Sequence, residues 1–481
     1  MPWQDPVVYQ IYPRSFQDSD GDGVGDLRGI RSRLDHLAWL GVDALWLSPI
    51  YPSPLADFGY DISDYEAVDP VYGSLADFDD LAGAAHERGL GLLLDLVPCH
   101  TSIEHRWFRE HPDWYVWADK PNNWLAAFGG SAWTFDERRG RYYLHSFYPE
   151  QPDLDWRNPE VVEAMQGVLR FWLDRGADGF RIDALDRLRK DPQLRDDPPA
   201  TEPPVLPVHA ESGSLSGLYS RNAPDIGEAV GQIRAAVGEG SLVGEIYLPS
   251  AKWEPYLAHL DAAFAFELFH APWDASALRS AIEATVDAAG NRAAWVLSNH
   301  DFPRMPTRFG PDNVRVATMM LLTLPGTAFI YQGDEVGMDD GPGHTPPFDR
   351  AGRDAHRHPM QWDASPSGGF TSGEPWLPLV DPERRNVADA RNDPDSLLHL
   401  YRKLIAARRS LGPGFRFRDD APEGMLAYDR GDRTVLLNTT SAPLRAPPVG
   451  NALLQTRADA LSAGELDAHS GVVCLPNPGS G

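Results

Sequence analysis

Three acidic residues each close an apolar run of the sequence, and together they could break a glycosidic bond. They are Asp183 in GFRID, Glu245 in VGEIY and Asp301 in SNHD. Retaining hydrolysis of a glycoside uses two carboxyl groups about 5–5.5 Å apart, one as nucleophile and one as general acid and base. Each residue alone is equally well a salt-bridge partner, a cap or a turn residue, but three such run ends favour one shared site.

The neighbours of these acids suggest a different role for each. Arg181 lies two positions before Asp183, so on a strand both side chains point to the same face. A guanidinium favours the ionised carboxylate, which is the form that a nucleophile needs. Glu245 is flanked by apolar residues that favour its protonated form, as a general acid requires. Asp301 follows His300 and is expected to hold sugar hydroxyls and to offset positive charge in the transition state.

Two histidines and a further aspartate also follow apolar runs. His100 and His300 come directly after such runs, and Asp61 lies in FGYDISDY. A neutral imidazole can bind one sugar hydroxyl, and a carboxylate can bind two. The adjacent Cys99 and His100 raise a catalytic zinc site as an alternative. The sequence has neither HExxH nor a CxxC pair, so we do not expect zinc.

The segment DSDGDGVGD at 18–26 has the ligand order of a calcium loop. The candidate ligands are the carboxylates of Asp18, Asp20, Asp22 and Asp26 and the carbonyl of Val24. The twelfth position is Gly29 instead of the closing glutamate, and no helix is expected before the loop. We therefore expect a single structural Ca²⁺ site, with Mg²⁺ as the alternative ion. An acidic surface turn without metal is the competing interpretation.

Strand-like apolar runs alternate with helix-like segments along most of the chain. The runs span 7–13, 44–50, 90–98, 179–183, 241–247, 293–301 and 326–335. One helix is expected over 159–176, with Asn158 as its N-cap and Pro159 in its first turn. This alternation predicts a parallel sheet with crossover helices. The acids end the runs, where a closed barrel has its active-site face and an open sheet its crevice. No GxGxxG follows an early strand, so a dinucleotide fold is not expected.

Two stretches break the alternation and set the expected domain boundaries. Residues 101–157 are rich in Trp, Pro, Asn and Gly and are interpreted as an excursion from the barrel after its third strand. After about residue 410 short alternating strands predict a small β domain. The expected division is 1–100 and 158–410 for the barrel, 101–157 for the insertion and 411–481 for the terminal domain. The Pro-rich stretch 191–208 is expected to form an extended surface loop.

Composition argues against several classes of partner. The 481 residues carry a formal net charge of −27, whereas nucleic acids and anionic membranes need a basic surface. No apolar run reaches the roughly 18 residues that span a bilayer. A neutral ligand or a cation fits this charge, although solubility alone also explains it. The two cysteines make no disulfide framework and the N-terminus lacks a signal-peptide pattern, so a cytoplasmic protein is expected.

A series of ordered motifs covers nearly the whole chain. They are QIYPRSFQDSDGDGVGDL, FGYDISDY, DLVPCH, QPDLDW, GFRIDA, GEIY, SNHDFPR, QGDE and RHPMQWD. By these motifs the sequence resembles the α-amylase superfamily, glycoside hydrolase family 13, and within it the bacterial α-glucosidases and oligo-1,6-glucosidases. The resemblance implies an α/β fold, a (β/α)8 TIM barrel with an inserted domain B after strand 3 and a small C-terminal β-sandwich domain.

The resemblance also implies roles for individual residues. Asp183 looks like the nucleophile, Glu245 like the acid and base, and Asp301 like the transition-state stabiliser. The positions that match the grip on the glucosyl unit are Asp61, His100, Arg181, His300 and Arg357. The positions that match the family's N-terminal calcium loop are Asp18, Asp20, Asp22, Val24 and Asp26.

The sequence departs from the family's motifs at three positions. Cys99 replaces the usual Asn of DLVPNH. That Asn often binds calcium in true α-amylases, so their calcium site is not expected here. Asp155 replaces Asn in QPDLNW, and His358 replaces Thr in RTPMQW. None of these changes removes a catalytic residue.

The function implied by the resemblance is an exo-acting, retaining α-glucosidase that hydrolyses small neutral α-glucosides through a covalent intermediate on Asp183. In this branch a Val after the nucleophile accompanies α-1,6 cleavage and a smaller residue accompanies α-1,4 cleavage, so Ala184 predicts an α-1,4 preference. The alternative is a transglucosylase or isomerase on the same scaffold, trehalose synthase-like or sucrose-converting, because the covalent intermediate is shared. A more remote alternative is a non-catalytic relative of amino-acid transporter heavy chains.

Overall fold

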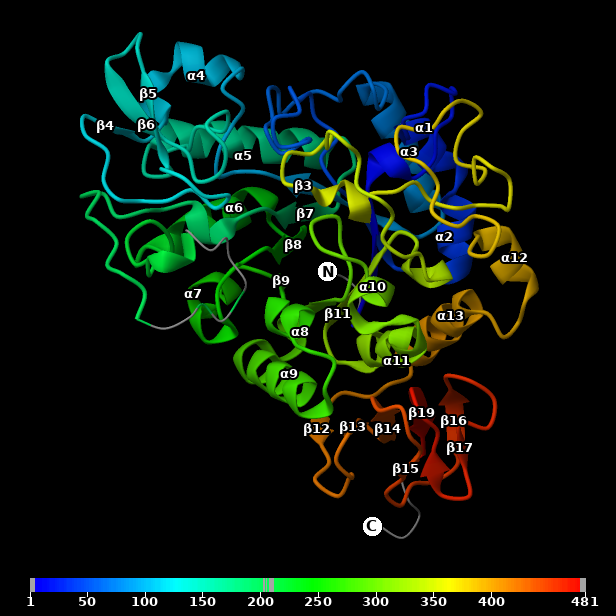
Figure 1. Cartoon of the computed structure of the whole chain (residues 1–481). Helices are drawn as coiled ribbons and strands as arrows, with labels where there is room; N and C mark the ends of the chain where they lie inside the picture. Colours follow the sequence, from blue (N-terminus) through cyan, green and yellow to red (C-terminus); the bar gives the residue numbers. More distant parts are fainter. Residues whose placement is uncertain (1–4, 202–203, 205, 207–211, 476–481) are drawn as a thin grey trace.

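Eight parallel strands close into a barrel at the centre of the computed structural model, which describes residues 5–201, 204, 206 and 212–475 (Figure 1). The strand order is β1-β11-β10-β9-β8-β7-β3-β2. The strands are β1 (Val7–Ile11), β2 (Ala44–Leu47), β3 (Gly91–Leu96), β7 (Gly179–Ile182), β8 (Ser241–Gly244), β9 (Ala262–Phe264), β10 (Ala293–Val296) and β11 (Thr327–Tyr331). The (β/α)8 barrel expected from the sequence is confirmed.

The register of the strands brings the predicted acids to one end of the barrel. Asp95 on β3 pairs with Arg181 on β7, and Ile182 on β7 pairs with Gly244 on β8. Asp183 and Glu245 are therefore the next residues of two adjacent strands. Because all barrel strands run in parallel, their side chains meet at the carboxyl-terminal face, where barrel enzymes have their active sites.

One barrel strand, β9, was not predicted from the sequence. The apolar run at Ala262–Phe264, β9, has only three residues and carries no acid at its end, so it resembles the interior of a helix as much as a strand. Its three residues are buried, and it pairs with β8 on one side and β10 on the other. It supplies the strand that closes the barrel.

Helices surround the barrel and cover its outer face (Figure 1). The longer ones are α3 (Leu75–Glu87), α5 (Pro159–Asp174), α6 (Ile226–Val237), α9 (Ala275–Ala289), α11 (Val314–Thr323) and α13 (Leu397–Arg408). The shorter ones are α1 (Leu27–Ser32), α2 (Leu34–Leu40), α7 (Glu254–Leu257), α8 (Phe266–His270), α10 (Met305–Phe309) and α12 (Val387–Asn392), whereas α4 (Arg106–Glu110) lies beside β5 (Trp133–Asp136) and β6 (Arg141–Leu144) in the excursion after β3. The predicted cap of α5 is confirmed, because the Asn158 side chain accepts from the Glu160 backbone N–H.

Two layers of apolar side chains hold these elements together. A small cluster fills the barrel interior, with Trp46, Phe264 and Phe329 as its largest members. A much larger cluster lies between the strands and the surrounding helices. Filled barrels of this kind leave only the carboxyl-terminal mouth free for a ligand.

The excursion after β3 forms a small antiparallel sheet in the order β4-β6-β5. Its strands are β4 (Trp117–Ala118), β5 (Trp133–Asp136) and β6 (Arg141–Leu144). Trp124 and Trp133 of this insertion pack in one cluster with Leu194 and Tyr219 from the segment after β7. The described part of 191–208, expected to be an extended surface loop, thus lies partly against the insertion.

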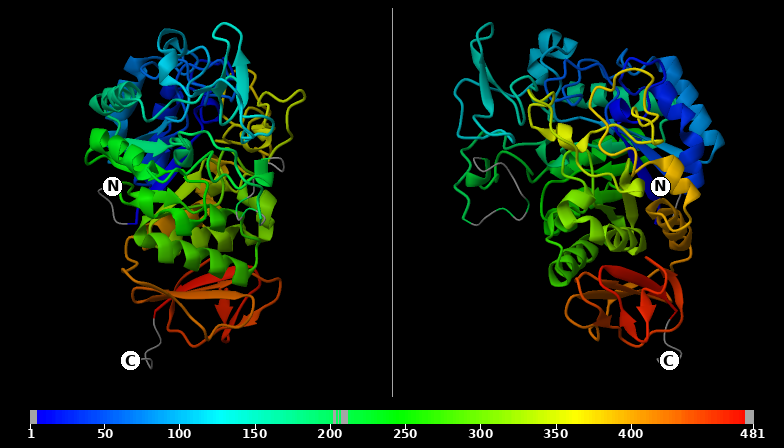
Figure 2. Two further views of the ribbon diagram at one scale, coloured as in Figure 1. Left: turned by 90° about the vertical axis from the view of Figure 1, so that its left-hand side faces the viewer. Right: turned by 45° about the vertical axis from the view of Figure 1, so that its right-hand side comes forward.

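Two antiparallel sheets make up the C-terminal region below the barrel (Figure 2). The five-stranded sheet has the order β12-β13-β14-β19-β16 and the three-stranded sheet the order β15-β18-β17. The strands are β12 (Phe415–Phe417), β13 (Met425–Arg430), β14 (Arg433–Asn438), β15 (Leu444–Arg445), β16 (Ala452–Gln455), β17 (Leu461–Ser462), β18 (Glu465–Leu466) and β19 (Ser470–Cys474). Helices α9 and α11 contact this region from the barrel. Across the described residues, no helix combines the length and apolar character needed to cross a membrane.

Candidate active site

A cavity of about 440 Å³ opens at the carboxyl-terminal face of the barrel. Asp183, Glu245 and Asp301 all line it, as the sequence predicted. The aromatic rings of Phe128 and Phe147, from the insertion after β3, form part of its wall. The insertion therefore builds one side of the site instead of standing apart from it.

Arg181 lies beneath the cavity and binds three carboxylates at once. Its Nη1 contacts Asp95 Oδ1 at 2.8 Å and Asp183 Oδ1 at 2.7 Å, and its Nη2 contacts Glu245 Oε2 at 2.9 Å. Arg181 is fully buried. Because one planar guanidinium holds both Asp183 and Glu245, the two carboxyl groups are close neighbours with a fixed orientation.

Arg181 acts on Asp183 as the sequence suggested, since its charge lowers the pKa of Asp183, but burial and the neighbouring acids oppose it. Burial raises the pKa of Asp183 well above its usual range, and the nearby Glu245 and Asp95 carboxylates raise it further despite Arg181. One positive charge shared by three acids cannot compensate all of them. The pKa of Asp95 is likewise raised by burial, to about 7. The Asp183 and Glu245 carboxyl groups lie in hydrogen-bond contact with each other.

The residue after the nucleophile candidate has an unusual backbone conformation. Ala184 has φ 45° and ψ 44°, in the left-handed region, which costs an L-residue about 1–2 kcal/mol. This conformation directs the Ala184 N–H to Glu245 Oε2 at 3.1 Å. The backbone at Ala184 thus provides a second donor that fixes the Glu245 carboxylate, and strain of this kind is common at functional sites.

Asp301 stands in a positive environment. Its Oδ1 lies 2.9 Å from Arg353 Nη1 and 3.4 Å from Arg357 Nη2. Burial opposes ionisation, but the positive charges of Arg353 and Arg357 lower the pKa of Asp301 well below its usual range. Asp301 is therefore ionised at any physiological pH, as the stabiliser of a positive transition state must be.

His300 supports this arrangement from behind the cavity wall. Its Nδ1 accepts from Gln10 Nε2 at 2.8 Å, and its Nε2 lies 2.6 Å from the Tyr60 hydroxyl. Burial lowers the pKa of His300 to about 3, so the ring is neutral. The Tyr60 ring stacks on it at 5.5 Å and itself lines the cavity. Tyr60 is a site residue that the sequence analysis missed.

Asp57 takes the place that the sequence analysis gave to Asp61. Asp57 lines the cavity and contacts Arg353 Nη2 at 2.5 Å and Gln151 Nε2 at 2.9 Å. Asp61 is fully buried behind it and accepts from Ser53 Oγ and from the backbone N–H groups of Ala56 and Asp57. Asp61 therefore holds the loop in shape, and Asp57 is the carboxylate that faces the ligand space.

Arg353 likewise takes the place given to Arg357. Arg353 lines the cavity, and its guanidinium bridges Asp57 and Asp301. Arg357 is fully buried, donates from Nε to the His300 carbonyl at 2.8 Å, and lies 3.3 Å from the Tyr12 hydroxyl. Arg357 thus positions the loop that carries Asp301, and Arg353 is the arginine that faces the ligand space.

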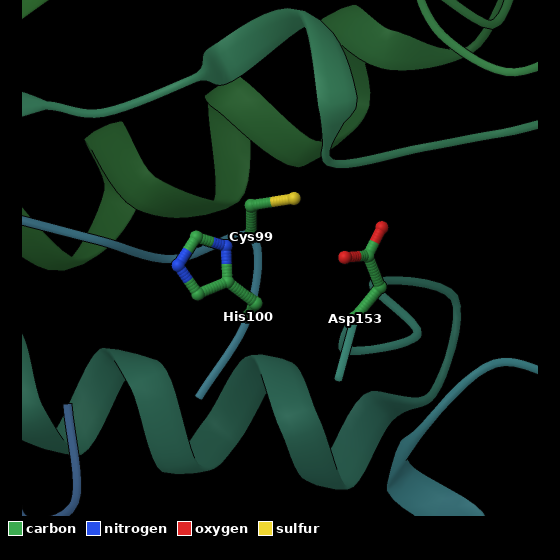
Figure 3. A group of neighbouring side chains, drawn as sticks. All are labelled: Cys99, His100 and Asp153. Carbon is green, nitrogen blue, oxygen red and sulfur yellow. The ribbon is translucent and has the colours of Figure 1, made fainter. Parts of the chain in front are cut away.

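His100 lines the cavity as predicted, and it belongs to a buried polar group with Cys99 and Asp153 (Figure 3). The three side chains could hold a metal ion, but Lys190 already supplies a positive charge there. Its Nζ lies 2.5 Å from Asp153 Oδ2 and 3.8 Å from Cys99 Sγ. Burial raises the pKa of the Cys99 thiol to about 12, which opposes the thiolate that zinc requires. The ammonium group of Lys190 therefore pairs with Asp153 and takes the place that a cation would have beside this carboxylate.

The N-terminal acidic loop folds as a compact turn. Carboxylate oxygens of Asp18, Asp20 and Asp22 lie within 4.8 Å of one another. Burial opposes ionisation of Asp18, but donors that include Thr371 and the backbone N–H groups of the loop lower its pKa. Asp26 caps α1 and accepts from Gly29 N and from Ser19. The three grouped carboxylates suit a hard cation, and Asp26 also serves the protein's own helix.

Most of the sequence matches a protein-family model. The model "Alpha amylase, catalytic domain" covers residues 10–412, which include the barrel, the insertion and every residue described in the cavity. The match ends just before β12, the first strand of the C-terminal sheets.

Several characterised or annotated relatives are similar over most of their length. A "Probable alpha-glucosidase" from Rhizobium meliloti (strain 1021) is 41% identical over 462 residues, covering 85% of this chain and 82% of that protein. An "Alpha-glucosidase" from Culex pipiens is 40% identical, covering 84% and 75%. An "Oligo-1,6-glucosidase" from Parageobacillus thermoglucosidasius is 37% identical, covering 85% and 83%.

Solved structures show the same fold over nearly the whole chain. The alpha-glucosyl transfer enzyme XgtA has a TM-score of 0.90 and 37% identity, and the match covers 99% of each chain. The trehalulose synthase MutB from Pseudomonas mesoacidophila MX-45 has a TM-score of 0.88 and 31% identity, covering 98% of this chain and 99% of that one.

Proposed function

This chain belongs to glycoside hydrolase family 13, the α-amylase superfamily, and on that premise we propose that it is an exo-acting, retaining α-glucosidase of short α-glucosides. The relatives of α-glucosidase and oligo-1,6-glucosidase type support hydrolysis of a terminal glucosyl unit. The substrate class and the chemistry below are argued from the cavity of this chain.

The observation that carries the proposal is the shared guanidinium of Arg181. It holds Asp183 and Glu245 at 2.7 and 2.9 Å, so the two carboxyl groups lie too close together for a nucleophilic water molecule to fit between Asp183 and the anomeric carbon. Inverting glycosidases need such room and separate their carboxyl groups by about 6.5–9.5 Å, whereas retaining enzymes keep them close. The geometry therefore favours a double displacement.

In this reaction Glu245 gives a proton to the glycosidic oxygen as the bond from that oxygen to the anomeric carbon breaks. An Asp183 oxygen attacks that carbon and forms a glucosyl ester. Glu245, now ionised, takes a proton from water, which attacks the same carbon and releases glucose. Asp301, ionised beside Arg353, stabilises the positive charge that develops in both steps.

The end of the cavity supports an exo mode of action. The ion pair between Asp57 and Arg353, at 2.5 Å, places a carboxylate and a guanidinium where the non-reducing hydroxyls of one glucosyl unit would lie. Hydrogen bonds to fixed, buried charged groups discriminate strongly against a substrate that lacks the matching hydroxyl. A terminal glucosyl unit has free hydroxyls that can bind both the Asp57 carboxylate and the Arg353 guanidinium.

The proposal is tested by glucose release from maltose, isomaltose, trehalose and sucrose, with the Asp183→Ala variant as control. We expect α-configured glucose as the first product of maltose, visible by proton NMR before mutarotation, and a loss of at least about 10⁴-fold in the variant. First release of the β-anomer would contradict the retaining mechanism. No turnover of any of the sugars would restore the non-catalytic alternative.

A transglucosylase or isomerase is the second candidate, supported by the likeness to the alpha-glucosyl transfer enzyme XgtA and to trehalulose synthase. Both reactions share the glucosyl-enzyme step with hydrolysis and differ only in the acceptor. Chromatography of reactions at high sucrose or maltose separates the candidates. New disaccharides exceeding free glucose would favour transfer or isomerisation.

The linkage preference is part of the proposal. The relatives include both α-glucosidases and oligo-1,6-glucosidases, so they leave the linkage open. Ala184 lines the cavity beside the nucleophile, and its small side chain supports α-1,4 cleavage. We accordingly propose maltose and short malto-oligosaccharides over isomaltose.

A structural calcium ion in the N-terminal loop completes the proposed enzyme, with Mg²⁺ as the alternative. The carboxylates of Asp18, Asp20 and Asp22 and the Val24 carbonyl would hold it, and Asp26 would join them from the helix cap. Oxygen donors grouped within 4.8 Å fit a hard cation. The ion would neutralise the loop's charge and lies outside the reaction.

The proposed location is the cytoplasm. Both cysteines, Cys99 and Cys474, are buried and free, as is usual for proteins of a reducing compartment. Fractionation of the source cells with an antibody against the chain would test this.

A further inference from the structure

A second hollow of about 490 Å³ adjoins the active-site cavity. Arg187, Arg221 and Tyr247 line both spaces, so these residues form the boundary across which one ligand could extend. The hollow does not contain Asp57, Asp301 or Arg353, which hold the glucosyl end of the cavity. It is therefore an extension toward the other part of a bound glucoside.

The chemistry of Glu245 shows which part of the substrate reaches this hollow. Glu245 protonates the leaving oxygen, so the leaving group must lie on the Glu245 side of the nucleophile. Tyr247 comes two residues after Glu245, and Arg221 Nη1 lies 3.4 Å from the Tyr247 carbonyl. The two arginines thus stand along the path of the aglycone.

The charge of this hollow is the reverse of the charge of the chain. Its described walls carry the cations Arg187, Arg221 and Lys252 and one carboxylate, Asp197, whereas the chain has a net charge of −27. The Asp197 carboxylate also accepts from the Tyr219 backbone N–H at 2.6 Å. An excess of cations is thus retained at one place on a strongly acidic protein.

The two boundary arginines are poorly neutralised by the protein itself. Among the described residues, no carboxylate lies within ion-pair distance of Arg187, whose guanidinium stands 5.3 Å from the Phe147 ring. Arg221 has only a 3.7 Å contact with Asp186 Oδ2. Burial lowers the pKa of Arg221, the Asp186 and Asp197 carboxylates raise it, and the positive charge of Arg187 lowers it, in keeping with the two arginines lining the same two spaces. Such an arrangement is unfavourable until an anion lies between the guanidinium groups.

We propose that Arg187 and Arg221 form an oxyanion-binding aglycone site, so that the preferred substrates are α-glucosides whose leaving group carries a carboxylate or a phosphate. The inference rests on the proposed α-glucosidase function and narrows its substrate class. It departs from the neutral ligand expected from the composition. Guanidinium groups match both oxyanions in bidentate geometry, so the test includes one pair of substrates for each.

The test compares substrates that differ only in this charge. Maltobionate and maltitol are both open-chain 4-O-α-glucosides, and they differ by a carboxylate in place of a hydroxymethyl group. We expect kcat/KM to be at least about tenfold higher for maltobionate, the gain typical of one charge-assisted hydrogen bond. The preference should shrink as NaCl rises, because salt screens exposed charges. Trehalose 6-phosphate against trehalose is the phosphate pair.

Variants then assign the effect to the two arginines. Arg187→Gln and Arg221→Gln should each lower the ratio of maltobionate to maltitol kcat/KM about tenfold. Arg138→Gln, an exposed arginine on the insertion outside both cavities, should keep the wild-type ratio. The wild-type ratio is itself a test if a variant does not fold.

The outcomes distinguish the two proposals. Hydrolysis of maltitol without preference for either anionic substrate would overturn this inference and leave the α-glucosidase function in place. A preference for only one pair would identify the oxyanion as carboxylate or phosphate. A preference that all three variants preserve would contradict the assignment to Arg187 and Arg221. No hydrolysis of any of these glucosides would overturn both proposals.

Discussion

Asp57 and Asp61 are four positions apart in one loop, and only one of them faces the ligand space. Asp57 contacts Arg353 at 2.5 Å, so Asp57→Asn should lower kcat/KM for maltose about ten- to hundredfold through a lost charged contact. Asp61→Asn replaces one of the two carboxylate oxygens that accept from the Ala56 and Asp57 N–H groups with an NH2 group, which leaves one of those donors without its acceptor, and should mainly lower the melting temperature. Kinetics and thermal melting of both variants check this. The reverse pattern would return the binding role to Asp61.

These two residues show where sequence reasoning stops at this scale. The motifs place Asp183, Glu245, Asp301 and His100 correctly in the cavity, because Asp183 and Glu245 directly follow barrel strands and the other two come within a few residues of a strand end. Within longer loops that argument fails. FGYDISDY and AGRDAHRH offer alternative acids and arginines a few residues apart, and only the folded loop decides which of them faces inward.

Substitution of Ala184 tests both the linkage preference of the enzyme and the backbone strain at this position. Ala184→Val should raise hydrolysis of isomaltose relative to maltose, because the larger side chain reshapes the cavity next to Asp183. The variant should also melt earlier, since a β-branched residue is strongly disfavoured at φ 45°. The ratio of the two rates, measured well below the melting temperature, checks the first effect, and calorimetry checks the second. An unchanged ratio would sink the linkage proposal.

At the scale of elements, the N-terminal loop can be tested by its response to metal. Calcium should raise the melting temperature after dialysis against a chelator, by RT ln(1 + [Ca²⁺]/Kd) in free energy. Asp20→Asn should weaken this shift, because it removes the charge of one of three grouped carboxylates and leaves an amide oxygen in its place. Asp64→Asn alters an exposed aspartate in another loop and is the matched control. A wild-type protein indifferent to both Ca²⁺ and Mg²⁺ would establish the loop as a metal-free turn.

The elements themselves were mostly readable from the sequence. Long apolar runs followed by helical patterns gave seven of the barrel strands, and Asn158 with Pro159 gave the start of α5. The missing strand, β9, has three residues and no polar residue to mark its end. Its strand conformation comes from pairing with β8 and β10, which is tertiary information that a local pattern does not contain.

At the scale of the whole molecule, buried neutral histidines link stability to pH. Burial lowers the pKa of His105 to about 3, and its Nδ1 accepts from the Trp107 N–H. The unfolded state, with its ordinary value near 6.5, binds the proton more readily. The stabilisation is therefore complete above about pH 6.5 and is lost as pH falls toward 3, by up to about 1.4 kcal/mol per pH unit.

His105→Asn isolates this effect, because asparagine also caps a helix but does not titrate. The variant should lose stability less steeply than the wild type between pH 6.5 and 4 in urea unfolding experiments. His344→Asn, which changes an exposed histidine, should keep the wild-type slope. Equal slopes for all three proteins would show that His105 takes no part.

The shared packing of the insertion with the segment after β7 has a consequence for how this enzyme can be re-engineered or can diverge. Trp124 and Trp133 form one apolar cluster with Leu194 and Tyr219, and Asn123 binds the backbone of Asp197. A chimera in which only the insertion comes from another protein would leave Leu194 and Tyr219 without the tryptophans they pack against. The insertion and the segment after β7 would therefore have to be exchanged together. The cavity wall beside the glucosyl unit and the lining of the aglycone side would then change together.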